Sequence, residues 1–250
     1  MTRTTEPFSL IIPTNQVCKT LGVTPAENEN KVKSSYKVLR PGMILLKNYL
    51  SLSDQVEIVH ICEELGIGPG GFGQPGYEDG RKLQLQMLCL GRYWDPQTRY
   101  SKGYGFKVPQ IPDKFISLVE TALQDSQTLM NSEDELPWMS PNIGIVNFYT
   151  ATGRLGIHQD RDESWDSISK GSPVVSISIG DSAEFLYGDK RDVDKLDKVV
   201  LESGDILIFG GKSRNVYHGV KAIIPNSAPE VLLKESMLRP GRLNLTFRQY

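Results

Sequence analysis

The chain has few cysteines and no long apolar runs. Its three cysteines, Cys18, Cys62 and Cys89, have neither the spacing of a metal site nor the even number of a disulfide framework. This predicts a reducing, intracellular compartment. No apolar run approaches the length of a bilayer span, and the first residues lack the basic and apolar regions of a signal peptide. We therefore expect no membrane partner, and the nucleus, the cytoplasm and an organelle all stay open as compartments.

Charge of either sign is not in excess over the whole chain. The formal net charge is −2, which argues against strong nonspecific binding of a polyanion to the entire surface. Any basic binding surface must therefore be local. The 250 residues, 39% of them hydrophobic, suffice for one sizeable core. We expect a single compact protein that acts as a monomer.

Histidine is equally scarce, since the chain contains only His60, His158 and His218. His60 lies in a predicted helix over residues 51–66 and is interpreted as structural. In His158-Gln-Asp160 the two polar side chains lie on the same side of an extended backbone, and His218 supplies a third ligand. Two imidazoles and one carboxylate form the facial triad of non-haem Fe(II) oxygenases, which leaves positions open for co-substrate and oxygen. The alternative is a surface turn with a satisfied histidine.

The C-terminal run from Arg242 to Arg248 reads as a strand with one polar face. Arg242, Asn244, Thr246 and Arg248 alternate with Leu243, Leu245 and Phe247. Two arginines inside a sheet are costly without anionic partners, so this face should hold a ligand with carboxylates or phosphates, such as a dicarboxylate. The alternative is an exposed edge strand that carries ordinary surface charges.

With these motifs the chain resembles the AlkB family of Fe(II)- and 2-oxoglutarate-dependent dioxygenases, from about residue 83 to residue 250. The segment from Gly91 to Ser101 looks most like the plant AlkB homologue 1 branch. The resemblance rests on Asn147-Phe-Tyr149, the run His158 to Glu163, Gly204-Asp205 followed by Gly210-Gly211-Lys-Ser-Arg214, Tyr217-His218-Gly219, and Arg242-x-Asn244-x-Thr246-x-Arg248.

The resemblance implies the cofactors and their ligands. Fe(II), 2-oxoglutarate and O2 would be used, with ascorbate stimulatory. His158, Asp160 and His218 would bind the iron and form the catalytic centre. Arg242 would clamp the distal carboxylate of 2-oxoglutarate, assisted by Tyr149 and Asn244, and Arg248 and Asn147 would lie nearer its iron-chelating end.

The expected fold is mostly β with flanking helices (α+β), with a double-stranded β-helix, or jelly-roll, core. We expect an N-terminal arm over residues 1–40 and an N-terminal extension over 41–140 that holds supporting helices at 51–66 and 114–130. The extension would also carry a nucleotide-recognition lid at about 80–107, and residues 141–250 would form the catalytic core. Strands are predicted at 41–50, 143–149, 174–179, 183–187, 198–201, 205–209 and 243–247. Residues 222–239 are expected to loop out.

Residues 81–107 suggest the substrate, because six lysines or arginines and five aromatic residues stand there against one acid, Asp95. This mixture is typical of surfaces that contact phosphates and stack on bases. The resemblance implies that Trp94, or otherwise Tyr93, stacks on a base opposite His158. The predicted substrate-binding residues are Tyr93, Trp94, Tyr100, Asp162 at the base edge, Glu163, and Arg191 near a phosphate. The competing interpretations are a packing role for Trp94 and, for Asp162 and Glu163, a solvated turn or a support for Arg161.

The sequence thus predicts oxidative demethylation of N-methylated bases, such as N6-methyladenine, 1-methyladenine or 3-methylcytosine, in DNA or RNA. Formaldehyde, succinate and CO2 would be released. The substrate base would be single-stranded or flipped out of its stack, since the iron lies inside a barrel. An oxygenase of protein or small-molecule substrates and a non-catalytic reader of modified nucleic acid stay open as alternatives. The sequence decides neither the base nor the polymer.

Overall fold

The computed structural model describes residues 7–12, 35–101, 107–130 and 136–250, with no description of the Ser101 side chain. Most of the predicted N-terminal arm therefore lies outside the described residues. So do Cys18, residues 131–135, and Lys102, Tyr104 and Phe106 of the basic aromatic stretch at 81–107.

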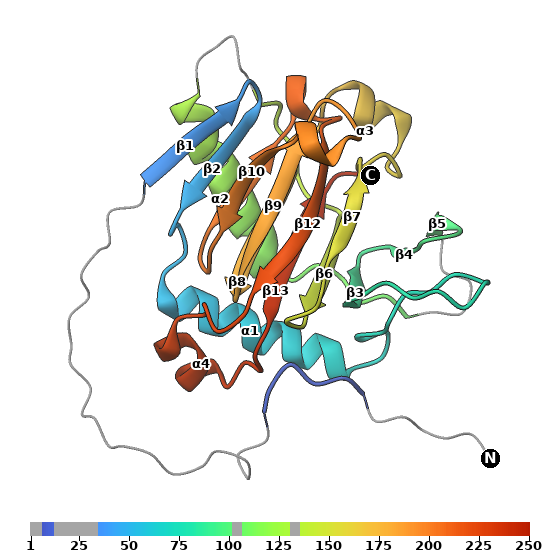
Figure 1. Ribbon diagram of the computed structural model, residues 1–250, viewed down its shortest axis with the longest axis vertical. Helices are drawn as coiled ribbons and strands as arrows, with labels where there is room; N and C mark the ends of the chain where they lie inside the picture. The colour runs from blue at the N-terminus through green and yellow to red at the C-terminus, as the bar shows by residue number, and fades with distance from the viewer. Residues whose placement is uncertain (1–6, 13–34, 102–106, 131–135) are drawn as a thin grey trace.

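Two antiparallel sheets face each other and form the double-stranded β-helix (Figure 1). The larger sheet has seven strands in the order β1-β2-β11-β8-β13-β6-β3, and the smaller has four in the order β10-β9-β12-β7. The larger sheet consists of β1 (Ser35–Arg40), β2 (Met43–Lys47), β3 (Gln86–Leu90), β6 (Ile143–Tyr149), β8 (Val174–Gly180), β11 (Ile206–Phe209) and β13 (Arg242–Arg248). The smaller consists of β7 (Leu155–His158), β9 (Ser182–Gly188), β10 (Asp197–Leu201) and β12 (Tyr217–Ile224).

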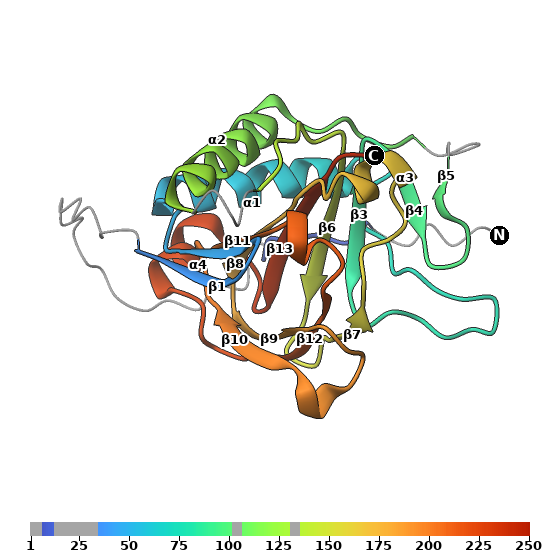
Figure 2. The ribbon, with the colours of Figure 1, turned by 90° about the horizontal axis from the view of Figure 1, so that it is seen from above.

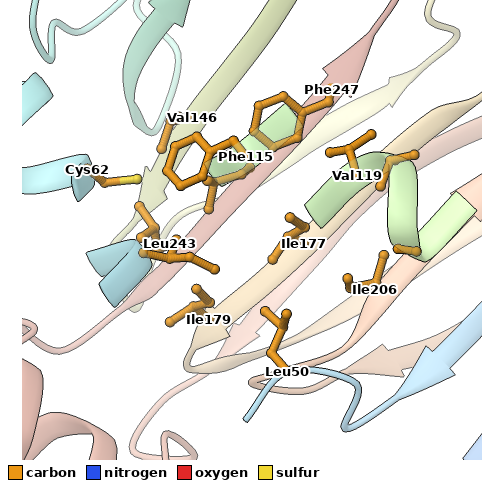
Figure 3. Packing of buried hydrophobic residues seen from close by; sticks show 14 of the residues in the cluster. Leu50, Cys62, Phe115, Val119, Val146, Ile177, Ile179, Ile206, Leu243 and Phe247 are labelled. Carbon is orange, nitrogen blue, oxygen red and sulfur yellow. The ribbon is translucent and has the colours of Figure 1, made fainter. Parts of the chain in front are cut away.

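Helices cover one face of the larger sheet, while the smaller sheet lies against the other face (Figure 2). They are α1 (Leu52–Ile67), α2 (Asp113–Leu129) and α4 (Glu230–Ser236). The Ser51 side chain caps α1 by accepting a hydrogen bond from the Asp54 backbone amide. Phe115 and Val119 of α2 pack on Phe247, Ile177 and neighbouring strand residues in a dry core (Figure 3). This layer holds the larger sheet rigid beneath the site.

A second buried cluster fills the space between the two sheets. It contains Leu45 and Phe209 from the larger sheet and Phe185, Tyr187 and Val220 from the smaller one. Because strand side chains alternate, the residues of the larger sheet that do not face the helices face this interior. The polar residues of β13 lie on the same interior face, where water is largely excluded.

Strand β13 is central in its sheet, paired with β8 on one side and β6 on the other. All seven of its residues are buried. The interpretation as an exposed edge strand is therefore wrong, and the polar face points into the molecule. The leucines of β13 and Phe247 point the other way, into the buried cluster between the larger sheet and the helices, as the alternation predicted.

Three parts of the fold differ from the sequence expectation. Residues 35–40 form β1 rather than an irregular arm, and 86–90 form β3 inside the stretch interpreted as a lid. Residues 222–239 do not loop out, because 222–224 continue β12 and α4 follows with Leu232 buried in the core. Strands β1, β2 and β3 all join the larger sheet, and the division at residue 141 stays a prediction. Among the described residues, no helix is long and apolar enough to span a membrane.

Candidate metal centre and its two pockets

His158, Asp160 and His218 come together between the sheets. His158 ends β7, Asp160 follows two residues later, and His218 pairs directly with His158 across the β7–β12 ladder. One ligand atom from each residue lies within 4.8 Å of the others. Nε2 of His158 is 3.6 Å from Asp160 Oδ1, and Nε2 of His218 is 3.7 Å from Asp160 Oδ2. Neighbouring ligands of one octahedral metal lie about 3 Å apart, so a small inward shift would bring these three atoms to the spacing of one face of its coordination shell.

Backbone carbonyls orient both imidazoles toward this centre. The Gly156 oxygen lies 2.8 Å from Nδ1 of His158, and the Val216 oxygen lies 3.1 Å from Nδ1 of His218. A carbonyl oxygen only accepts, so each Nδ1 carries the proton and each Nε2 keeps a lone pair for a metal.

The protonation states of Asp160 and His218 also suit metal binding, whereas His158 holds a proton more readily. Burial alone would raise the pKa of Asp160, but the Arg248 charge and the two histidines hold it well below its usual value. Burial lowers the pKa of His218 to about 4. Burial also opposes protonation of His158, yet the Asp160 hydrogen bond and charge outweigh it and raise the pKa. The carboxylate is therefore ionised and His218 neutral at physiological pH, as a metal requires.

A small inner pocket lies on one side of the triad. It is lined by the triad and by all five predicted co-substrate residues, Asn147, Tyr149, Arg242, Asn244 and Arg248. Asn244 is fully engaged, since its amide donates to Ser176 Oγ and the Ile177 carbonyl and its oxygen accepts from Thr246.

Arg242, which lines the same pocket, lacks hydrogen-bond partners for part of its guanidinium. Its side chain is 1% exposed, and only Nη2 has a partner, Ser178 Oγ at 2.9 Å. Nε and Nη1 are buried without a hydrogen bond, and so is Oδ1 of Asn147. Burial lowers the pKa of Arg242 to about 10. A buried guanidinium with two open donors is costly alone, and a carboxylate that accepts from both would satisfy it.

An outer cleft of about 560 Å³ also borders the triad. It is lined by Trp94, Tyr100, Asp162, Glu163 and Arg191 among the predicted substrate contacts, and by His158 and Asp160. Tyr93 is not among the described residues that line this cleft and packs against the cluster between the sheets. Tyr77, which the sequence reasoning missed, also lines it, with the Arg81 guanidinium 5.1 Å from its ring centre.

A short hairpin forms one wall of the cleft, built from β4 (Tyr93–Asp95) and β5 (Arg99–Ser101). The Trp94 indole N–H donates to Asp162 Oδ2 at 2.9 Å, and Arg99 Nη1 lies 3.5 Å from the same oxygen. Arg248 donates to the Tyr100 hydroxyl at 2.9 Å. Trp94 is half-buried, packs against the cluster between the sheets as Tyr93 does, and also lines the cleft, so its packing and stacking interpretations both stay open.

Glu163 has a different environment from the other predicted substrate contacts. Its side chain is 1% exposed, and its two oxygens pair with Arg214 Nη2 at 2.9 Å and Arg248 Nε at 3.2 Å. The interpretation of Glu163 as part of a solvated turn is wrong. Although it borders the cleft, its carboxylate is committed to these guanidiniums. Arg214, 2% exposed, is a residue whose role the sequence reasoning missed, although it ends the motif Gly210-Gly211-Lys-Ser-Arg214 on which the resemblance rests.

A family model described as the 2OG-Fe(II) oxygenase superfamily matches residues 42–248 of this chain. The chain belongs to this superfamily. DNA N(6)-methyladenine demethylase ALKBH1D of Arabidopsis thaliana is 59% identical over 229 residues, which cover 88% of this chain and 52% of that protein. The tRNA demethylase abh1 of Schizosaccharomyces pombe is 31% identical over 250 residues, 84% of this chain and 79% of that protein.

Among solved structures, that of OsALKBH1 matches with a TM-score of 0.82 and 55% identity, covering 86% of this chain and 100% of that one. These relatives confirm an AlkB-family oxygenase of the ALKBH1 branch with a jelly-roll core. The chain spans about half the length of the curated plant relatives that it matches.

Fe(II), 2-oxoglutarate and O2 are the cofactors of this superfamily, and the residues present fit them. The His158, Asp160 and His218 donor set is the facial triad that suits Fe(II). The open donors of Arg242, beyond the triad in the inner pocket, fit a carboxylate.

Proposed function

We propose that this AlkB-family protein oxidatively demethylates N-methylated bases, such as N6-methyladenine, 1-methyladenine or 3-methylcytosine, in DNA or RNA. The observation that carries the proposal is the position of the triad. It borders both a polar inner pocket with an unsatisfied buried arginine and an outer cleft with an aromatic wall. A co-substrate in the inner pocket and a base in the outer cleft can therefore both reach one metal.

In the proposed site, His158, Asp160 and His218 hold Fe(II). Arg242 donates from Nε and Nη1 to the distal carboxylate of 2-oxoglutarate, with the Tyr149 ring at 5.7 Å from its guanidinium carbon. Asn147 and Arg248, which border both pockets, lie at the metal-chelating end. When bound, iron with 2-oxoglutarate and O2 would supply hydroxylation of the N-methyl carbon, with 2-oxoglutarate converted to succinate and CO2, and the hydroxymethyl group would then leave the base nitrogen as formaldehyde.

The outer cleft holds the base in this proposal, and within the 80–107 region the β4–β5 hairpin serves as the nucleotide-recognition lid. Trp94 supplies the stacking surface and Asp162 a hydrogen-bond acceptor for the base edge. Asp162 already binds the Trp94 indole, so an entering base competes with or extends that contact. Tyr100 and Tyr77 add aromatic walls, and exposed Arg191 lies where a phosphate can approach. The base is presented unstacked, because the triad lies inside the barrel.

Relatives with printed activities on both DNA and tRNA support a nucleic-acid substrate without selecting the polymer. We propose that the protein acts as a monomer in the nucleus, the cytoplasm or both. The free, buried thiols of Cys62 and Cys89 accord with a reducing compartment.

The test is incubation of the purified chain with Fe(II), ascorbate and 2-oxoglutarate against methylated DNA and RNA oligonucleotides, single- and double-stranded, read by mass spectrometry. Loss of one methyl group with equimolar succinate is expected, and His158→Ala is the matched inactive control. Succinate formation with every oligonucleotide unchanged would redirect the substrate to proteins or small molecules. Binding of methylated oligonucleotides with no succinate would make the chain a reader.

A further inference from the structure

Two arginines donate hydrogen bonds to the proposed metal ligand Asp160, one to its backbone carbonyl and the other to its carboxylate. Arg214 Nη1 donates to the Asp160 backbone carbonyl at 2.6 Å. On the other side, Arg248 donates to the Asp160 carboxylate, from Nε to Oδ2 at 3.1 Å and from Nη2 to Oδ1 at 3.0 Å. Backbone and side chain of this ligand are thus fixed independently.

Glu163 joins these two arginines into a closed ring. Its Oε2 accepts from Arg214 Nη2 at 2.9 Å and its Oε1 lies 3.2 Å from Arg248 Nε. The ring therefore runs from the Asp160 carbonyl through Arg214, Glu163 and Arg248 back to the Asp160 carboxylate. Two positive and two negative side chains give it no net charge.

A buried ring of charges stabilises a fold poorly compared with apolar packing, because each charge loses its hydration. Its value lies in fixed geometry. Asp160 has left β7, so no strand ladder holds it. Contacts from the segment before β12 take the place of that ladder. Arg214 donates to the Asp160 backbone carbonyl, and the Asn215 backbone carbonyl accepts a hydrogen bond from the Gln159 side-chain amide. Arg214 thereby ties the ligand of one loop to the strand that carries His218.

Resting on the proposed function, we infer that Arg214 and Glu163 are positioning residues that set the metal affinity of the triad by holding Asp160 in its ligating orientation. Neither has to contact iron, 2-oxoglutarate or base. Outer partners of this kind change metal affinity by on the order of 10- to 100-fold when they are removed.

Three variants separate geometry from charge. Arg214→Gln is too short to bridge both acceptors, and we expect an Mn(II) dissociation constant raised by at least about tenfold. Arg214→Lys keeps the charge but lacks the planar fork, so it reaches one acceptor and should recover part of the loss. Glu163→Gln keeps the shape but leaves two guanidiniums against one carboxylate, and this excess positive charge should also weaken Mn(II) binding.

The experiment is anaerobic titration of the full chain with Mn(II) at saturating 2-oxoglutarate, with free Mn(II) read by electron paramagnetic resonance. Val119→Ala is the control, because Val119 is 0% exposed in α2 behind the larger sheet, so its loss lowers stability without touching the site. Thermal unfolding of each variant is recorded beside the titration. Affinity for 2-oxoglutarate at saturating Mn(II) should stay unchanged, since Arg242 is intact.

Weaker Mn(II) binding in Arg214→Gln and Glu163→Gln, partial recovery in Arg214→Lys and no change in Val119→Ala would support the inference. Equal Mn(II) affinity in wild type, Arg214→Lys and Glu163→Gln would overturn it and leave the proposed function standing. Wild-type protein that binds no Mn(II) with 2-oxoglutarate would instead overturn the proposed function, and this inference with it. If Arg214→Gln does not fold, the other two variants decide.

Discussion

Replacement of Arg242 by methionine should remove 2-oxoglutarate binding without destabilising the unliganded protein. Two buried donors, Nε and Nη1, have no partner until a carboxylate arrives. Charge-assisted hydrogen bonds contribute about 1.5–3 kcal/mol each, so the pair contributes about 3–6 kcal/mol. At about 1.4 kcal/mol per tenfold, the dissociation constant should rise by about a hundredfold to ten-thousandfold.

Although Arg242→Met should lose affinity for 2-oxoglutarate, its stability without ligand should not fall. Burial lowers the pKa of Arg242 from 12.5 to about 10, and about 1.4 kcal/mol per pKa unit gives a cost of about 3 kcal/mol for keeping the charge. The bond to Ser178 returns about 1 kcal/mol of this. Arg242→Met should therefore unfold at the same temperature as wild type or higher, although methionine fills the site less well.

The assay is thermal unfolding with and without 2-oxoglutarate at saturating Mn(II), beside isothermal titration. The wild type should gain stability with ligand, while Arg242→Met should show no ligand-dependent gain. Arg239→Met is the control, since Arg239 lies over the Phe8 ring, away from the pocket, and its loss should leave 2-oxoglutarate binding intact. A destabilised Arg242→Met that still binds 2-oxoglutarate normally would refute the reasoning.

Three further outcomes are expected. Asp160→Ala should abolish succinate formation while circular dichroism stays native, and retained turnover would remove Asp160 from the ligands. Trp94→Ala should raise the KM for the oligonucleotide by roughly five- to a hundredfold, because base stacking contributes about 1–3 kcal/mol, and leave the KM for 2-oxoglutarate unchanged; an unchanged oligonucleotide KM would make Trp94 a packing residue. Mn(II) affinity should fall with a slope of one proton per metal as the pH drops through the raised pKa of His158, since His218, with a pKa of about 4, is already neutral there. A two-proton slope in titrations between pH 8 and 5 would contradict these protonation states.

The sequence predicted best where alternation was strict. The period of two in Arg242 to Arg248 predicted both the strand and its polar interior face. In the structure β13 is a central strand, with strands of the same sheet on both sides. The helices at Leu52–Ile67 and Asp113–Leu129 carried clear periodicity or caps and were found within one or two residues.

Other parts depended on tertiary contacts that carry no local signal. Strand β3 lies in a stretch that was interpreted as a lid because of its basic and aromatic residues. Its pairing with β6, more than fifty residues away in the chain, makes it a strand. Glu163 was predicted to bind the substrate. Its ion pairs with Arg214 and Arg248 could not be predicted, because these partners are distant in the chain and meet it only in the fold. Arg214 itself has no periodicity that separates it from a surface turn. A buried charge network is a property of the assembled barrel, so sequence patterns do not reveal it.

The most direct test of the account is a crystal structure of the chain with Mn(II) and 2-oxoglutarate, grown without oxygen. The account predicts one metal bound by Nε2 of His158, a carboxylate oxygen of Asp160 and Nε2 of His218, with the distal carboxylate of 2-oxoglutarate accepting from Nε and Nη1 of Arg242. A metal bound elsewhere, or 2-oxoglutarate outside the inner pocket with Arg242 still unpartnered, would contradict it.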